Sequence, residues 1–203
     1  MDVSTGFSYI HEGLAQYPTI DILGVNISRL GTDETHRLCI QEIAAKRGGF
    51  ICFANVHTVT GSLDSFGLKN ALNSALLSVA DGVPLLWVSR WWRQPIQSRV
   101  CGPDFMAEFL LKHSDICHAF VGGKPGVAER IIQKFQLSDG VSYSPPFRPF
   151  SREAALEDWS EVLKRAGDRV PVCVWVGLGA PKQELWMKEV STQGVSALFF
   201  GVG

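Results

Sequence analysis

The residues best suited to chemistry lie in one short segment, residues 176–184, which reads Val-Gly-Leu-Gly-Ala-Pro-Lys-Gln-Glu. An apolar run typical of a buried strand, residues 170–176, precedes it, and a pattern typical of a helix start follows it. The free N–H groups and positive dipole end of such a helix start favour phosphate. Lys182 adds a positive charge and Gln183 a neutral donor and acceptor, so the segment suits a phosphorylated or sugar ligand. The alternative is a plain connecting loop, because many such loops contain glycines and bind nothing.

Apolar runs typical of strands alternate with helical patterns along most of the chain. The predicted strands lie at residues 20–27, 50–56, 85–88, 118–121 and 170–176, with a last one that leads into a glycine loop within residues 197–203. The predicted helices lie at residues 32–46, 62–80, 104–112, 127–135 and 152–166, with another starting at Gln183. This alternation predicts an α/β fold with a Rossmann-like, mostly parallel sheet and helices on both faces, in one domain over residues 1–203.

Ligands of such sheets bind at the carboxyl ends of the strands. Three predicted strands are followed there by polar or glycine-rich segments: Asn55 and His57, Gly122 and Gly123, and residues 177–183. Asp81 is predicted at the end of a helix, just before the strand at residues 85–88. The predicted topology therefore gathers these residues at one edge of the sheet.

Composition excludes several classes of protein. The formal net charge of −1 gives no broad electrostatic reason to expect a nucleic acid partner. The polar N-terminal residues 1–17 do not resemble a signal peptide, and no apolar run reaches the roughly 20 residues of a membrane span. We therefore expect a protein that is soluble or peripheral to a membrane.

The cysteines and histidines do not predict a metal site. The five cysteines are scattered without a Cys-x-x-Cys pair, and most lie in apolar surroundings that are typical of reduced core residues. The five histidines show no ligand spacing with them. We expect neither a structural nor a catalytic metal.

Five motifs occur in a fixed order: Asn55-Val56-His57, residues 80–84 (Ala-Asp-Gly-Val-Pro), residues 99–104 (Arg-Val-Cys-Gly-Pro-Asp), residues 120–126 (Phe-Val-Gly-Gly-Lys-Pro-Gly) and residues 176–184. Together they resemble the WecG/TagA/CpsF family of bacterial glycosyltransferases, over roughly residues 26–203. The order of all five makes the match specific, whereas any one of them alone would not.

The resemblance implies a cytoplasmic enzyme that is peripheral to the inner face of the cell membrane. It implies transfer of a sugar from a UDP-sugar donor to a polyprenyl-diphosphate-linked saccharide acceptor, in the synthesis of cell-surface polysaccharide. The family inverts the anomeric centre and is not thought to need a metal. Neither the donor sugar nor the oligomeric state follows from the sequence, so a homo-oligomer remains open.

By this resemblance Asp81 is the catalytic base, which takes the proton from the acceptor hydroxyl as that hydroxyl attacks the anomeric carbon. Without the resemblance, Asp81-Gly82 is a plain turn. Asn55 matches an asparagine that contacts the donor sugar, and is otherwise a turn residue. Arg99 matches an arginine near the active site that is suited to diphosphate or sugar oxygens.

Gln183 matches a glutamine that faces the donor sugar, and Lys182 beside it is a further substrate-binding candidate. Lys182 and Glu184 have an alternative role in capping and pairing the helix that they open. His57 is a second acid–base candidate, although an isolated histidine beside a strand end is more often structural.

The nucleotide is expected to lie against Gly122, Gly123, Gly177 and Gly179, where glycine lets the backbone approach closely. The alternative is that these glycines only permit tight turns. Phe147 matches a position near the uracil, where an aromatic face can stack on the base, but a place in the core is the alternative.

The chain departs from the family in two respects. Phe53 replaces a threonine that some members carry, so a donor contact by that hydroxyl is absent. The family also continues past the position of Gly203 into an arginine-bearing appendage that is thought to help close the site and meet the membrane. A chain that ends at Gly203 is expected to bind the donor yet turn over poorly.

Three tryptophans are interleaved with arginines within residues 87–99: Trp87, Trp91 and Trp92 with Arg90, Arg93 and Arg99. This pattern suits a membrane interface or a lipid-linked acceptor. The alternative is that the tryptophans pack at the edge of the sheet.

Two functions from other classes compete with a glycosyltransferase. An NAD-dependent oxidoreductase is disfavoured, because no Gly-x-Gly-x-x-Gly motif follows the first predicted strand. A non-catalytic or degenerate nucleotide-sugar-binding protein stays open, although the presence of Asp81 and Gln183 argues against loss of activity.

Overall fold

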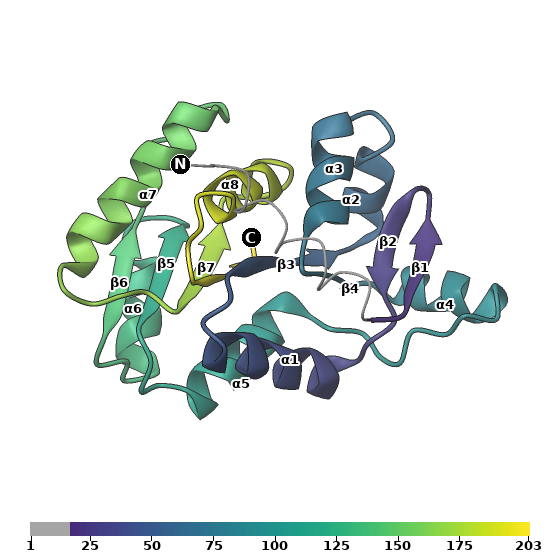
Figure 1. Ribbon diagram of the computed structural model, residues 1–203, viewed down its shortest axis with the longest axis horizontal. Helices are drawn as coiled ribbons and strands as arrows, with labels where there is room; N and C mark the ends of the chain where they lie inside the picture. The colour runs from purple at the N-terminus through teal and green to yellow at the C-terminus, as the bar shows by residue number, and fades with distance from the viewer. Residues whose placement is uncertain (1–16) are drawn as a thin grey trace, which may run out of the picture.

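The computed structural model describes residues 17–203, which form a single eight-stranded sheet with helices on both faces (Figure 1). The strands are β1 (Thr19–Ile22), β2 (Val25–Ser28), β3 (Gly49–Ala54), β4 (Leu77–Ala80), β5 (His118–Gly122), β6 (Gly140–Tyr143), β7 (Cys173–Gly177) and β8 (Leu198–Gly201). The helices are α1 (Thr32–Ala44), α2 (Val56–Gly61), α3 (Phe66–Ser74), α4 (Val83–Trp91), α5 (Gly102–Lys112), α6 (Val127–Lys134), α7 (Arg152–Ala166) and α8 (Lys182–Ser191).

The strands lie in the order β1-β2-β4-β3-β8-β7-β5-β6. Strand β1 pairs antiparallel with β2, and every other neighbouring pair is parallel. Parallel neighbours require crossover connections, which the helices supply. The predicted α/β class, with a Rossmann-like, mostly parallel sheet, is confirmed.

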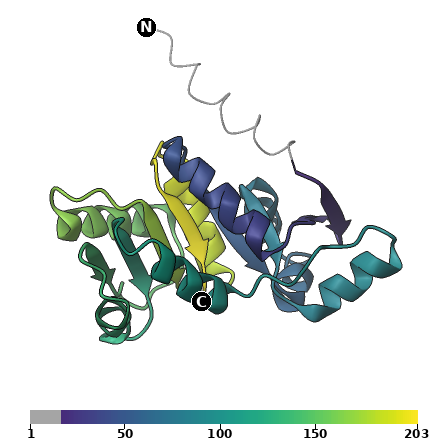
Figure 2. The ribbon, with the colours of Figure 1, turned by 90° about the horizontal axis from the view of Figure 1, so that it is seen from below.

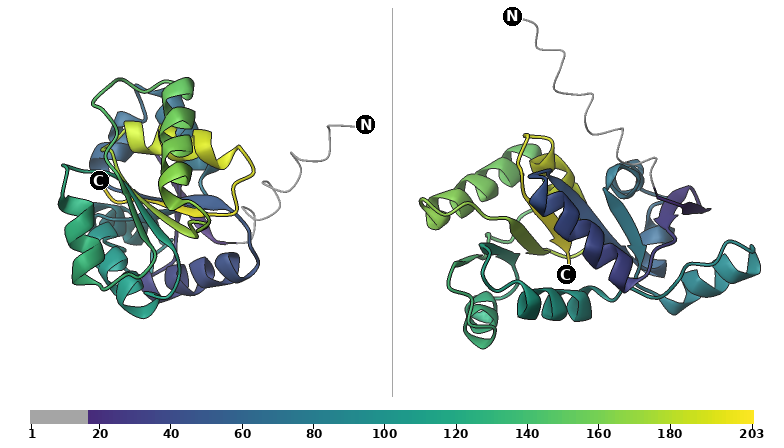
Figure 3. Two further views of the ribbon diagram at one scale, coloured as in Figure 1. Left: turned by 90° about the vertical axis from the view of Figure 1, so that its left-hand side faces the viewer. Right: turned by 60° about the horizontal axis from the view of Figure 1, so that its bottom comes forward.

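Helices cover the sheet from both sides, with α3, α7 and α8 on one face and α1, α5 and α6 on the other (Figures 1 and 3). Consecutive residues of the central strand β8 serve both layers, because successive side chains of a strand point to opposite faces. Phe199 packs edge-on against Trp159 of α7 and Trp186 of α8, with ring centroids 5.5 and 5.9 Å away. Phe200 packs against Phe109 of α5 on the opposite face, with centroids 5.7 Å apart.

The predicted elements at residues 62–80 and 85–88 were wrong. The first segment is not one helix, since α3 ends at Ser74 and the four buried residues of β4 follow. The second is not a strand but the middle of α4, whose first turn contains Pro84. A short apolar run without clear period is consistent with either structure, so periodicity alone did not separate them. As a consequence, Asp81 follows a strand and not a helix.

The predicted strand at residues 20–27 is a hairpin of β1 and β2. Leu23 and Gly24 both have positive φ at its turn, and the Asp21 carboxylate accepts a hydrogen bond from the Gly24 N–H at 2.8 Å. Leucine is not a usual turn residue, so the sequence carried a weak turn signal there. Strand β6, at the far edge of the sheet, was also missed.

Other predicted elements agree with the structure to within a few residues, and the predicted helix at residues 152–166 coincides with α7. Within residues 17–203, no helix combines the length and apolar character that crossing a bilayer requires.

The aromatic layer between α5 and the sheet is expected to dominate stability. Phe109 is completely buried, so Phe109→Ala leaves a cavity and should lower the free energy of unfolding by about 3–5 kcal/mol. Leu111→Ala on the same helix is the control, because Leu111 is exposed and its loss should cost about 0.5 kcal/mol or less. Urea unfolding of both variants measures the difference, and equal losses would contradict this account of the core.

Candidate active site

The sequence-predicted site residues follow four neighbouring parts of the sheet. Asp81 follows β4, Asn55 follows β3, and the glycine loops follow β7 and β5. Strand β8 lies between β3 and β7 and ends at the same edge. Because all these strands are parallel, their carboxyl ends gather the four segments along one edge of the sheet. This agrees with the prediction for Asn55 and the glycine loops, whereas Asp81 reaches the edge at the end of β4 and not at the end of a helix.

Asp81 is held in place by three hydrogen bonds. Its backbone N–H donates to the carbonyl of Ala54 at 2.7 Å, which continues the pairing of β4 with β3. Its carboxylate accepts from Arg99 Nε at 3.2 Å and from the Gly102 N–H, at the start of α5, at 3.4 Å. The carboxylate is still 20% exposed, so a ligand can reach it. A fixed, accessible carboxylate is the geometry that a general base needs.

Arg99 completes a pair with Asp81. The hydrogen bond from its guanidinium to the carboxylate raises the pKa of Arg99 above its ordinary value, so Arg99 keeps its positive charge. The side chain of Arg99 is 46% exposed, so a ligand at this edge of the sheet can reach its guanidinium.

Asn55 is the N-cap of α2. Its side-chain oxygen accepts from the Thr58 N–H at 3.0 Å, and the Thr58 hydroxyl accepts from the Asn55 N–H at 2.9 Å, which forms a capping box. Within residues 17–203 the side-chain NH₂ of Asn55 has no hydrogen-bond partner and is available to a sugar oxygen. His57 lies in the first turn of the same helix and is exposed.

The glycine loops after β5 and β7 touch each other. The Gly123 N–H donates to the carbonyl of Gly177 at 3.1 Å, and both Gly122 and Gly123 have positive φ. A Cβ atom at Gly122 would lie only 2.5 Å from that carbonyl oxygen, so no larger residue fits. Gly179 also has positive φ but faces open space. The structure therefore has a tight turn at Gly122 and Gly123 that requires glycine, and contact of these residues with a nucleotide stays a prediction.

Gln183 is buried, with 3% of its surface exposed. Its side-chain oxygen accepts from the Gly203 N–H at 3.1 Å, and its NH₂ donates to Glu184 at 2.9 Å. The side chain thus holds the segment after β8 against the start of α8, and contact of Gln183 with a donor sugar stays a prediction. Lys182 donates to the carbonyl of Arg148 at 2.9 Å, which ties the proline-rich loop to α8.

Glu184 is buried beside Gln183, whereas the sequence suggested for it only a role in capping and pairing the helix that it opens. It is 2% exposed, and within residues 17–203 its Oε2 has no hydrogen-bond partner. Burial raises the pKa of its carboxyl above the ordinary value. An acidic residue in the first turn of a helix is usually exposed and stabilises the dipole, so no local signal could reveal this burial.

Phe147 is completely exposed, which rules out the alternative that it belongs to the core. Its neighbour Arg148 is anchored by the buried carboxylate of Asp158 at 2.8 Å and by Glu157 at 2.8 Å. The ring of Phe147 is therefore available for stacking, and that role stays a prediction.

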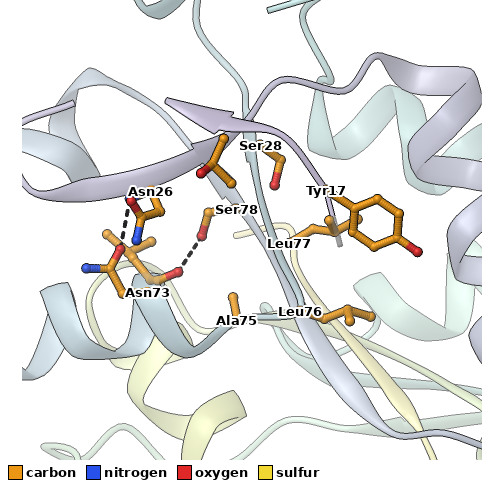
Figure 4. Close-up of a pocket in the computed structure, with 10 residues that line it drawn as sticks. Tyr17, Asn26, Ser28, Asn73, Ala75, Leu76, Leu77 and Ser78 are labelled. Atoms are coloured by element: carbon orange, nitrogen blue, oxygen red, sulfur yellow. Dashed lines mark hydrogen bonds between the residues drawn. The ribbon is translucent and has the colours of Figure 1, made fainter. Parts of the chain in front are cut away.

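The cavity in Figure 4, of about 130 Å³, lies away from this edge of the sheet. It is lined by the first residues of β4, by the hairpin and by the end of α3. Two of its polar side chains bond to the protein: Asn73 accepts from the Asn26 N–H at 2.9 Å, and Ser78 donates to the carbonyl of Leu72 at 2.7 Å. These bonds join α3 to the sheet. In the described part of the chain, no three histidine, cysteine or acidic side chains form a metal-binding group.

The buried carboxyl of Glu184 should make stability depend on pH. Because its pKa is raised in the folded state, its contribution to stability is complete below its ordinary pKa of 4.5 and is lost as pH rises through the raised pKa. Glu184→Gln keeps the shape of the neutral acid, so the free energy of unfolding of the wild type should fall relative to this variant as the pH rises above 4.5. The exposed Glu153→Gln is the control. Urea unfolding at several pH values measures this, and parallel profiles for wild type and Glu184→Gln would contradict it.

Comparisons with known proteins find the same relationship that the motifs suggested. Residues 20–203 match the glycosyl transferase WecG/TagA/CpsF family. Among curated relatives, the N-acetylglucosaminyldiphosphoundecaprenol N-acetyl-beta-D-mannosaminyltransferases of Staphylococcus aureus strains NCTC 8325 / PS 47 and COL are each 28% identical over 157 residues. These alignments cover 76% of this chain and 60% of each relative, so the chain spans only part of their length.

The family match covers every segment that forms the carboxyl edge of the sheet, from β3 and Asn55 to the residues after β8. Fold, motif order and comparison agree, and this chain belongs to the WecG/TagA/CpsF family of glycosyltransferases.

Proposed function

We propose that this protein is an inverting glycosyltransferase that moves a sugar from a UDP-sugar to a polyprenyl-diphosphate-linked saccharide in cell-surface polysaccharide synthesis. It acts without a metal, at the inner face of the cell membrane. Family membership supports the reaction class, and the relatives' name specifies a saccharide on diphosphoundecaprenol as their acceptor. The observation that carries the proposal is the fixed, accessible carboxylate of Asp81 beside Asn55.

The order of strands supports an inverting reaction. Asp81 and the glycine loops lie on opposite sides of the ends of β3 and β8. A donor sugar that lies over those ends, near Asn55 and Gln183, has the base on one side and its diphosphate on the other. Attack by the acceptor oxygen from the side of Asp81 then displaces the diphosphate from the opposite face, which inverts the anomeric carbon.

Each group has a defined part in that step. Asp81 takes the proton of the acceptor hydroxyl as its oxygen forms the new bond to the anomeric carbon. The bond from that carbon to the diphosphate oxygen breaks, and UDP leaves with the electron pair. Arg99 stabilises negative charge near the reacting atoms, and the glycine loops after β5 and β7 let the diphosphate approach the backbone closely.

Removal of the base should abolish transfer without abolishing donor binding. For Asp81→Asn we expect kcat for transfer to fall by about 10²–10⁴-fold, the usual contribution of a general base, while the Kd for UDP changes little. The assay supplies a panel of UDP-sugars, UDP-N-acetylmannosamine included, and a short-chain polyprenyl-diphosphate-linked N-acetylglucosamine. Asp104→Asn, an exposed carboxylate in the first turn of α5, is the control and should remain active.

Full activity of Asp81→Asn would overturn its role as base and direct attention to His57. Binding of UDP by the wild type without transfer from any donor would favour the non-catalytic alternative.

The contact between the glycine loops should be needed for donor binding. Gly122→Ala places a methyl group against the carbonyl of Gly177 and forces the loops apart, so the Kd for UDP should rise about tenfold or more. Gly126→Ala is the matched control, because Gly126 also has positive φ but no atom within 4 Å of the added methyl group. Calorimetric titration with UDP compares the two. Unchanged affinity in a folded Gly122→Ala protein would show that the loops do not bind the nucleotide.

A further inference from the structure

Helix α4 exposes large aromatic side chains. Trp87 is 64% exposed and Trp91, one turn further on, is 84% exposed, while Trp92 at the end of the helix is 46% exposed. The alternative that these tryptophans pack at the edge of the sheet is therefore wrong. We call Trp87, Trp91 and Trp92, together with the exposed Arg90 and Arg93, the α4 surface.

The helix that carries the α4 surface is packed firmly against the core. Leu85 and Leu86 are buried in the core on its other side, and the Ser89 hydroxyl accepts from the N–H of the buried Ile96 at 3.0 Å. The helix lies at one end of the molecule, beside the β1–β2 hairpin, and points away from the sheet (Figures 2 and 3). The tryptophans are thus held outward by a packed scaffold.

The charged residues of the segment 82–103 are all positive. Between Asp81 and Asp104 the sequence contains no acidic residue, and it contains Arg90, Arg93 and Arg99. Arg99 is paired with Asp81, whereas Arg90 and Arg93 lie among the tryptophans. Arg93 lies two residues after the end of α4 and has positive φ, a conformation that favours glycine. Its N–H donates to the carbonyl of Arg90 at 3.0 Å.

Tryptophan has an apolar ring with one polar N–H, which suits the boundary between lipid chains and water. Arginine binds lipid phosphate there while its stem remains among apolar groups. Among residues 17–203, Arg90 and Arg93 form no ion pair, and residues 82–103 contain no carboxylate. Exposed tryptophans beside such arginines match an anionic bilayer in both polarity and charge.

We propose that the α4 surface docks the protein on an anionic lipid bilayer, with Trp87 and Trp91 in the interfacial layer and Arg90 and Arg93 on lipid phosphates. The helix begins directly after Asp81-Gly82, so docking places the catalytic edge next to the lipid surface. The purpose of this docking rests on the proposed function, because a polyprenyl-linked acceptor is carried in such a bilayer. The docking itself does not depend on catalysis.

Vesicle flotation tests the proposal with the 203-residue chain. The probes are vesicles of phosphatidylcholine alone and of phosphatidylcholine with phosphatidylglycerol. We expect the wild type to float with the anionic vesicles only. Trp87→Ala/Trp91→Ala and Arg90→Glu/Arg93→Glu should each reduce the bound fraction about tenfold or more. Tryptophan emission of the wild type should also shift to shorter wavelength with anionic vesicles.

Control variants replace exposed apolar or basic residues on other helices. Phe66→Ala/Leu111→Ala removes two exposed apolar side chains, and Arg37→Glu reverses an exposed charge on α1. Both should bind vesicles as the wild type does. Calorimetric titration with UDP and thermal unfolding accompany every variant, so that a failure of the proposed function, seen as loss of UDP binding or transfer by the wild type, is distinguished from a failure of docking.

Several results would overturn the proposal. One is a wild type that does not bind anionic vesicles, and another is equal binding by the α4 variants and the wild type. Equal losses in the controls would show a non-specific effect. A wild type that is dimeric in solution and becomes monomeric in Trp87→Ala/Trp91→Ala would show that a second copy of the chain covers the α4 surface.

Discussion

The site depends on the parallel pairing of β3 with β4 on one side and with β8 on the other. This pairing brings the ends of strands that are far apart in the chain to one edge of the sheet. The hydrogen bond from the Asp81 N–H to Ala54 extends it by one residue beyond β4, and so fixes the proposed base beside Asn55. Without that register, the carboxylate of Asp81 and the amide of Asn55 would not lie at neighbouring strand ends.

Hydrogen bonds between the loops at this edge hold the loops in place. Gly123 bonds to Gly177, Gln183 to Gly203, and Lys182 to the proline-rich loop. Several residues considered as ligand contacts therefore also hold the scaffold together. The two roles are compatible where a hydrogen-bonding group is left over, as on the side-chain NH₂ of Asn55, which has no partner within residues 17–203.

Much of the fold could be predicted from the sequence, because strands and helices of clear period and length alternate. The α/β class followed from that alternation, and α7 was predicted to the residue. The errors fell on short apolar runs, at β4 and α4, where periodicity does not separate a strand from a helix. Correcting them moved Asp81 from the end of a helix to the end of a strand, which strengthens its place at the site.

The sequence by itself determined the family, the fold class and the set of candidate residues, because these follow from residue types, spacing and order along the chain. Only the tertiary structure decided which of them are accessible. It buried Glu184 and Gln183, left Phe147 and the α4 tryptophans exposed, and joined Asp81 to Arg99. Burial and pairing depend on what packs against a residue from distant parts of the chain, and local sequence does not contain that information.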